Sequence, residues 1–263
     1  MSTIKLVRIS FLGRSVQCIA SFAEKLRKTE VRLRSEYDLA MIEVAPDFRP
    51  SFQEWHGVYS IGGYRDGGSM HGKGRAVDLN YPTNGYGASR TVRKSGRVVY
   101  GGEAAGGKLS GVREDFIAAV TYACDQVGVT CDLSARKEGE STGSVWDRWN
   151  TVSMAVRKLL APYYPAVDNY DAGDDDELPG VVIPEAIRKV YRKIRVVQVV
   201  GTPTANPRLT RNPAKSGILD LQRHTVVALA DECGLRWGPA DFGAAEAGDP
   251  QHFDDASRIL SGA

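Results

Sequence analysis

The stretch Ser69-Met70-His71-Gly72-Lys73-Gly74-Arg75-Ala76-Val77-Asp78-Leu79 decides the fold of this chain of 263 residues. His71 and Asp78 are seven positions apart. On one continuous strand, whose side chains alternate with period two, they would lie on opposite faces. Gly72 and Gly74 fall between them, and glycine adopts positive φ without steric cost. The stretch therefore predicts a glycine loop after His71 and then a strand on which Asp78 faces a site while its two neighbours face the core.

Two further stretches complete a candidate metal site. One is Asp249-Pro250-Gln251-His252-Phe253, near the C-terminus, and the other is Gly62-Gly63-Tyr64-Arg65, just before the first stretch. His71, Asp78 and His252 offer two imidazoles and one carboxylate. Three protein ligands leave the fourth tetrahedral position open, which is typical of catalytic rather than structural zinc. We therefore predict that these three residues bind Zn²⁺.

These residues resemble the signature of the LAS zinc peptidases, the family of D-Ala-D-Ala carboxypeptidases, VanX-type dipeptidases and phage L-alanyl-D-glutamate endopeptidases. That signature reads S-x-H-x-x-G-x-A-x-D and, much later, E/D-x-x-H. The fixed positions of the first motif are filled here by Ser69, His71, Gly74, Ala76 and Asp78, and those of the second by Asp249 and His252. Arg65 matches an arginine that precedes the first motif in the family, and residues 234–238 resemble its approach to the second. The resemblance covers roughly residues 45–85 and 216–258.

The resemblance also implies roles outside the ligand set. Asp249 is expected to be the general base for attack and then the general acid for the leaving amine. Arg65 is expected to stabilise the oxyanion or to hold a substrate carboxylate, and the Ser69 hydroxyl to hold a ligand or the substrate from outside the ligand set. Two positions depart from the family: Asp249 stands where many members have Glu, and Gln251 where many have Trp. Glu246, three residues earlier, is the alternative base.

Composition sets the broad class. Hydrophobic residues make up 42% of the chain and charged residues 25%, which is ordinary for a globular protein. A net charge of +2 gives no argument for a nucleic-acid partner. No stretch approaches the roughly 20 apolar residues of a membrane span. The first eight residues lead into no long apolar core and no small-residue cleavage site, so we expect no signal peptide and synthesis in a cytoplasm.

Hydrophobic periodicity predicts the remaining elements. We expect helices over residues 15–35, 112–127, 145–160, 185–197 and 218–233, a strand over 57–64, and a hairpin that joins 91–93 to 97–100. The fold class is α+β: a small antiparallel sheet with flanking helices carries the zinc site. Residues 1–104 and 216–263 form the peptidase domain, and residues 105–215 form a mainly helical insertion that flanks the cleft. A chain shortened between residues near 105 and 216 is expected to keep the zinc site folded.

Several residues outside the candidate metal site are expected to have a structural role rather than a functional one. His56 and His224 are expected to be structural, and the acidic run 174–177 to be a solvated loop, because it lacks the spacing of a calcium-binding loop. No C-x-x-C pair occurs, so we expect no cysteine zinc site. Cys124 and Cys131 are expected to be buried free thiols, with a disulfide between them as the alternative. The aromatics Trp146, Trp149, Tyr163 and Tyr164 are expected to form a core of the insertion.

The expected function follows from the resemblance. It is a zinc metallopeptidase, either an endopeptidase or a D,D- or L,D-carboxypeptidase, that cleaves peptidoglycan stem peptides containing D-amino acids. Without a signal peptide, a bacteriophage endolysin or a lysin bound to virion proteins is the natural setting, and the protein would act on the cell wall. The alternative is a non-enzymatic phage tail or interaction protein that retains the peptidase fold. Release of free amino groups from cell walls, with and without a chelator, separates the two.

Overall fold

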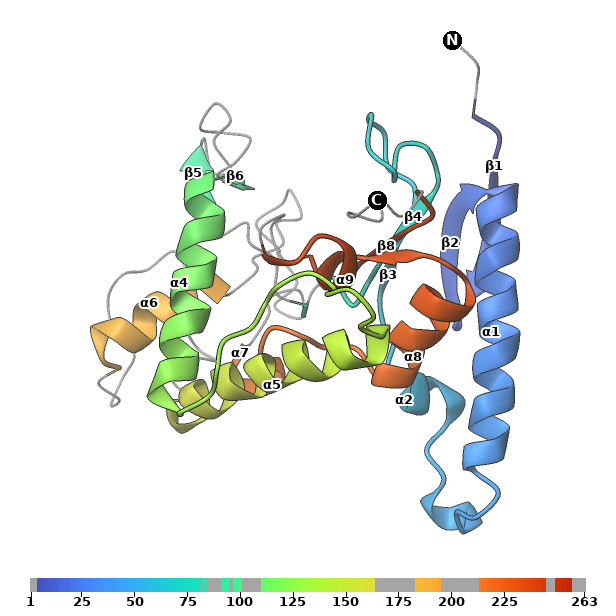
Figure 1. Cartoon of the computed structure of the whole chain (residues 1–263). Helices are drawn as coiled ribbons and strands as arrows, with labels where there is room; N and C mark the ends of the chain where they lie inside the picture. The colour runs from blue at the N-terminus through green and yellow to red at the C-terminus, as the bar shows by residue number, and fades with distance from the viewer. Residues whose placement is uncertain are drawn as a thin grey trace.

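The protein has an α+β fold in a computed structural model that describes residues 4–81, 83–84, 91–94, 97–100, 110–163, 183–194, 213–244 and 249–256. Its elements are, in chain order, β1 (Leu6–Phe11), β2 (Arg14–Ile19), α1 (Ala20–Ala40), η1 (Pro46–Phe48), α2 (Phe52–His56), β3 (Ile61–Gly62), β4 (Ala76–Leu79), β5 (Thr91–Lys94), β6 (Arg97–Tyr100), α4 (Ser110–Gln126), α5 (Thr142–Leu160), η2 (Ala161–Tyr163), α6 (Glu185–Ile194), α7 (Pro213–Ser216), α8 (Arg223–Val227), η4 (Ala228–Glu232), β7 (Arg236–Trp237), α9 (Gly238–Asp241) and β8 (His252–Asp254). Figure 1 shows α1 along one side and α4 and α6 at the other, with α5 running between them.

The chain begins with a hairpin, so the helix predicted over residues 15–35 was wrong at its start. β1 pairs antiparallel with β2 around a two-residue turn at Leu12 and Gly13, both with positive φ (49° and 73°). Along β2 the side chains of Val16 and Cys18 are buried while those of Ser15 and Gln17 are exposed. That alternation has period two, which is typical of a half-buried strand. Helix α1 therefore begins only at Ala20, and it packs Phe22, Leu26 and Leu33 into the core.

The sheet that carries the candidate site has the strand order β3-β4-β8-β7, and its neighbouring strands are antiparallel. β4 was predicted from sequence and is confirmed, with Val77 and Leu79 in the core. The predicted strand over residues 57–64 is reduced to Ile61–Gly62. Gly57 ends helix α2 in the left-handed conformation and breaks the strand there.

The predicted hairpin and three of the predicted helices are confirmed. β5 pairs antiparallel with β6, with Lys94 opposite Arg97, and α4, α5 and α6 lie where the apolar spacing placed them. The helix predicted over residues 218–233 begins later, at Arg223, and continues from α8 into a turn of wider π geometry in η4. Residues 174–177, Tyr164 and Glu246 lie outside the described part of the chain.

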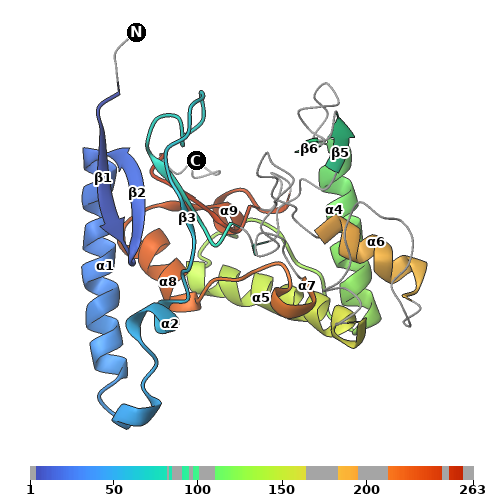
Figure 2. The same cartoon turned by 180° about the vertical axis from the view of Figure 1, so that it is seen from behind.

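One continuous hydrophobic cluster joins the elements from both ends of the sequence to α4, α5 and α6. Within it, α5 packs directly on α7, α8 and α9, and Figure 2 shows the same arrangement from behind. Trp149 of α5 is fully buried in this cluster, and Trp146 is partly buried with its Nε1–H donating to the carbonyl of Leu221. The division of the chain at residues 105 and 215 stays a prediction, but α5 shares its core with the C-terminal elements.

Among the described residues, no helix is both long and apolar enough to cross a membrane.

Candidate metal centre

The candidate site lies on two adjacent strands of the sheet. Antiparallel pairing of β4 with β8 sets Asp78 directly opposite His252, although 174 positions separate them in sequence. Opposite residues on neighbouring strands have their side chains on the same face of the sheet. The register of β4 and β8 therefore brings the carboxylate and one imidazole to a single point.

His71 reaches that point through the predicted glycine loop. Gly74 has a φ of 66° and its N–H donates to the carbonyl of His71 at 2.9 Å, which closes a tight turn before β4. Gly72 permits a second close approach: a Cβ built there would lie 1.7 Å from the carbonyl oxygen of Gly67. Neither position accepts a side chain without displacing backbone, so the loop that carries His71 depends on both glycines.

Three donor atoms converge at the centre. His71 Nε2 lies 3.0 Å from Asp78 Oδ1 and 3.3 Å from His252 Nδ1, and His252 Nδ1 lies 3.0 Å from Asp78 Oδ1. Ligand atoms bound to zinc at about 2.0–2.1 Å with tetrahedral angles would lie about 3.3 Å apart. The triad could therefore hold a metal ion with little movement, and its two nitrogens and one oxygen suit zinc and other transition-metal ions.

The outer nitrogen of each imidazole already has a partner. His71 Nδ1 lies 2.8 Å from the carbonyl oxygen of Gly63, and His252 Nε2 lies 3.0 Å from Asp254 Oδ2. Both partners are acceptors only, so these outer nitrogens carry the proton. The inner nitrogens face Asp78 and donate to it when they are protonated too. Once they lose that proton, they can offer a lone pair to a metal ion.

Electrostatics favour an ionised Asp78. Burial opposes its ionisation, but hydrogen bonds from His252 and His71 outweigh burial and hold the pKa of Asp78 below its usual range. Arg65 adds an ion pair to the second oxygen, Asp78 Oδ2. Asp78 therefore keeps a negative charge directed at the point where a cation would bind.

Asp249 lies beside the triad but outside its donor set. Its carbonyl accepts a hydrogen bond from His252 N at 3.2 Å, and the next carbonyl, that of Pro250, accepts one from Trp237 Nε1 at 2.8 Å. Asp249 Oδ1 is shielded from solvent and has no hydrogen-bond partner among the residues that the structure describes. Burial, reinforced by the negative charge of Asp78, raises the pKa of Asp249 to about 7. Asp249 as a whole is half-buried, but a shielded carboxylate oxygen without a partner is costly, so this oxygen is a candidate for a role at the site.

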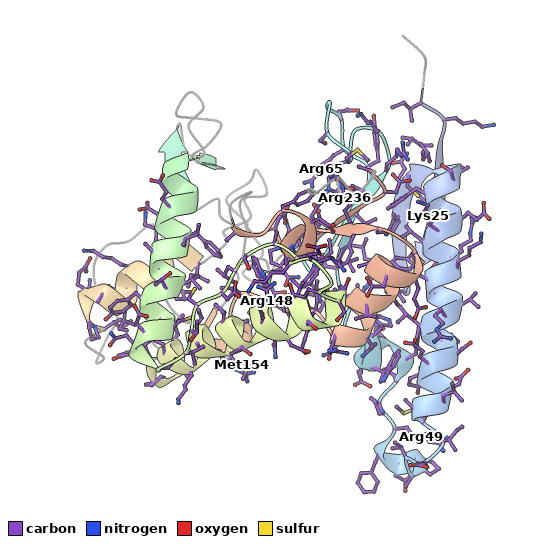
Figure 3. The ribbon with its side chains drawn as sticks, viewed as in Figure 1. Lys25, Arg49, Arg65, Arg148, Met154 and Arg236 are labelled. Atoms are coloured by element: carbon purple, nitrogen blue, oxygen red, sulfur yellow. The ribbon has the colours of Figure 1, made fainter. Side chains whose placement is uncertain are left out.

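The remaining predicted site residues lie at different distances from the centre. Arg65 pairs with Asp78 through one nitrogen while 62% of its side chain is exposed, so the rest of its guanidinium is open to solvent; Figure 3 labels it close to Arg236. Ser69 Oγ accepts a hydrogen bond from Gly72 N at 3.3 Å. Ser69 therefore stabilises the glycine loop, and no described contact joins it to the donor atoms.

Two residues that the sequence interpretation missed support the site from the C-terminal strands. Asp254 contacts His252 Nε2, and Arg236 contacts Asp254 with two nitrogens, at 2.7 and 2.8 Å. A local signal for Asp254 existed, because residues two apart on a strand share a face. Arg236 lies in the stretch 234–238 that resembles the family, but that resemblance gave it no role, and it meets Asp254 through the pairing of β7 with β8.

The other histidines and the cysteines lie outside this centre. His56 is buried on α2, and His224 stacks on Trp55 with ring centroids 3.8 Å apart. All four cysteines are free thiols. Cys18 and Cys124 are buried and Cys131 and Cys233 are half-buried, so the expectation of burial was wrong for Cys131.

Comparison of the chain with protein-family models, with curated proteins and with solved structures found no match.

Proposed function

We propose that the protein is a zinc-dependent peptidase that cleaves peptidoglycan stem peptides containing D-amino acids. The observation that carries this proposal is the convergence of His71 Nε2, Asp78 Oδ1 and His252 Nδ1 within 3.3 Å of one another. Three protein donors leave a fourth tetrahedral position for a substrate or water, as in catalytic zinc sites. The substrate class rests on the resemblance of the two motifs to the LAS peptidases.

The unpaired carboxylate of Asp249 supports an enzyme over a retained structural metal site. A purely structural centre gains nothing from a buried acceptor without a partner, since such a group reduces stability. A pKa near 7 suits a group that accepts and returns a proton at neutral pH. The unpaired oxygen of Asp249 would be a cost in a structural protein and is useful in an enzyme, so it favours the peptidase over the non-enzymatic phage structural protein.

The mechanism assigns one task to each side chain. His71, Asp78 and His252 would hold the zinc ion, which when bound supplies Lewis acidity to activate water and polarise a peptide carbonyl. Asp249 accepts the proton of the attacking water and transfers it to the leaving amine. Arg65, which is exposed beside Asp78, holds the negative charge that develops on the carbonyl oxygen, or a substrate carboxylate.

Two measurements on one preparation test the proposal. Protein purified without chelator is expected to contain about one zinc ion per chain, and the variants His71→Ala and His252→Ala are expected to contain almost none. The same wild-type protein is expected to release new amino groups from purified cell walls, and a chelator should stop the release. A zinc content near zero in the wild type would contradict the metal site, and a zinc-loaded protein that leaves cell walls intact would contradict the peptidase.

A further inference from the structure

The outer nitrogen of His252 contacts a buried carboxylate that the proposed reaction does not use. Asp254 Oδ2 lies 3.0 Å from His252 Nε2, and Asp254 is 1% exposed. Both residues are on β8, two positions apart, so their side chains leave the same face of the strand.

Asp254 is itself held in a single orientation. Arg236 donates to both of its oxygens, from Nε to Oδ1 at 2.7 Å and from Nη2 to Oδ2 at 2.8 Å, and Ala256 N donates to Oδ1 at 3.0 Å. The β7–β8 register places Arg236 directly opposite Asp254. The guanidinium also lies over the Phe242 ring, 4.8 Å from its centroid. A planar two-point contact of this kind fixes the carboxylate plane more strictly than a single donor would.

We propose that Asp254 and Arg236 are positioning residues for metal binding: Arg236 orients Asp254, and Asp254 holds the proton of His252 on Nε2 so that Nδ1 faces the metal ion. The inference rests on the metal site of the proposed function. A metal-ligating histidine commonly donates its other ring N–H to a carboxylate or carbonyl, which fixes the tautomer and the ring plane. His71 receives the same support from the backbone carbonyl of Gly63, which no substitution removes, so His252 is the ligand at which this support can be tested.

The adjacent residue provides a matched control. Asp255 is also a buried carboxylate on the same segment, and it is also paired with an arginine, Arg75, at 2.6 Å. Asp255 has no described contact with either histidine. Asp254→Asn and Asp255→Asn therefore remove the same charge from the same end of β8, but only the first disturbs a contact of a metal ligand.

Zinc affinity, measured by competition with a chromophoric chelator, is the first test. Asp254→Asn is expected to weaken zinc binding by about 10–100-fold, while Asp255→Asn is expected to stay close to the wild type. Arg236→Lys keeps the positive charge but loses the two-point contact, so we expect a smaller loss than in Asp254→Asn. Arg236→Lys also keeps the test valid if Asp254→Asn does not fold.

NMR of the imidazole N–H protons in the zinc-loaded protein is the second test. A general loss of stability would not shift the proton of His252 alone. In the wild type and in Asp255→Asn, we expect a downfield, slowly exchanging proton on His252 Nε2, with Nδ1 bound to zinc. In Asp254→Asn this proton is expected to move upfield and to exchange faster with solvent.

The outcomes separate this inference from the proposed function. Equal zinc affinity in Asp254→Asn and Asp255→Asn, with an unchanged His252 signal, overturns the positioning role even if cell walls are cleaved. Loss of affinity only in Asp254→Asn supports that role even if the wild type leaves cell walls intact. A wild-type protein that binds no zinc overturns both.

Discussion

At the residue scale, three aspartates within one site have three different environments. Asp78 is buried but accepts hydrogen bonds from two histidines, so its pKa lies below the usual range. Asp254 is also buried, and hydrogen bonds from His252 and Arg236 hold its pKa low as well. Asp249 is half-buried, its Oδ1 is shielded from solvent without a donor among the described residues, and its pKa rises to about 7. Environment, rather than residue type, therefore separates the candidate base from the two permanently charged carboxylates.

The first prediction separates the base from the ligands. Asp249→Asn is expected to retain zinc, because Asp249 is outside the donor set, and to lose about 10²–10⁴-fold in turnover, because the proton acceptor is removed. Zinc content and release of amino groups from cell walls measure the two effects. Glu246→Gln is the matched control and is expected to keep most activity. The reverse pattern would assign the role of base to Glu246.

The second prediction concerns stability in acid. Burial, together with the neighbouring His224, lowers the pKa of His56 to about 4, below its ordinary value of 6.5. The unfolded chain therefore binds a proton between these two values that the folded chain does not bind. The free energy of unfolding should decrease as the pH falls from about 6.5 to about 4, by at most about 3 kcal/mol from this residue.

His56→Asn tests this contribution, because the Asn oxygen can replace His56 Nδ1 as acceptor for Val58 N but does not titrate. Denaturant unfolding of the variant at pH 7 and at pH 5 is expected to show a smaller difference than the wild type shows. An equal difference in both proteins would mean that other groups cause the acid sensitivity.

At the element scale, the segment before β8 depends on the start of α9. A Cβ built on Gly238 would lie 2.0 Å from the carbonyl oxygen of Asp249. Trp237, the residue before it, donates its indole N–H to the carbonyl of Pro250. The junction of β7 and α9 thus sets the position of the candidate base, although about ten residues separate them along the chain.

The third prediction uses this contact. Gly238→Ala must displace the backbone of Asp249, and a displacement of about 1 Å can cost up to about 100-fold in rate. We expect turnover on cell walls to fall more than zinc content. The displaced carbonyl of Asp249 also accepts from His252 N, but His71 and Asp78 lie on other backbone. Gly68→Ala, where an added Cβ meets no atom within 4 Å, is the control and should leave turnover unchanged. Equal rates in the two variants would show that the segment adapts.

At the scale of the whole molecule, α5 connects the middle of the chain to the C-terminal elements. Its buried Ser153 accepts hydrogen bonds from Ile218 N at 2.8 Å and Leu219 N at 2.9 Å. Gly217 permits this approach: its φ is 67°, and a Cβ there would lie 2.3 Å from the carbonyl oxygen of Ser153. The turn before α8 is therefore built around a side chain of α5.

The fourth prediction measures that connection. Ser153→Ala removes an acceptor shared by two buried N–H groups and should lower the free energy of unfolding by about 1–3 kcal/mol. Denaturant titration measures the change. The neighbouring Met154 is 48% exposed on α5 (Figure 3), so Met154→Ala should change stability much less. A loss of stability as large in Met154→Ala would contradict the role of Ser153.

The fifth prediction concerns removal of residues 105–215. The sequence alone led us to expect a folded zinc site after this deletion, but the contacts of α5 with α7, α8 and α9 favour the opposite outcome. The deletion takes Trp149, Val152 and Val156 out of the continuous core, and loss of large core side chains costs about 2–5 kcal/mol each. We now expect an unfolded chain without zinc, as judged by circular dichroism and elemental analysis. A folded, zinc-bound deletion variant would restore the two-part division.

The sequence by itself determined the features that depend on local pattern. Strand β4, helices α4, α5 and α6 and the β5–β6 hairpin follow from apolar spacing and turn residues, which act over a few positions. The set His71, Asp78 and His252 was also predicted from sequence, because two short motifs resemble the LAS signature.

Only the tertiary structure decided what depends on register and packing. The pairing of β4 with β8 and of β8 with β7 brings Asp78, His252, Asp254 and Arg236 together, and no local pattern encodes which strands pair. The same holds for the burial that leaves Asp249 without a partner and for the packing of α5 on the C-terminal elements. These features arise from contacts between distant segments, whose free energy appears only when the core is assembled.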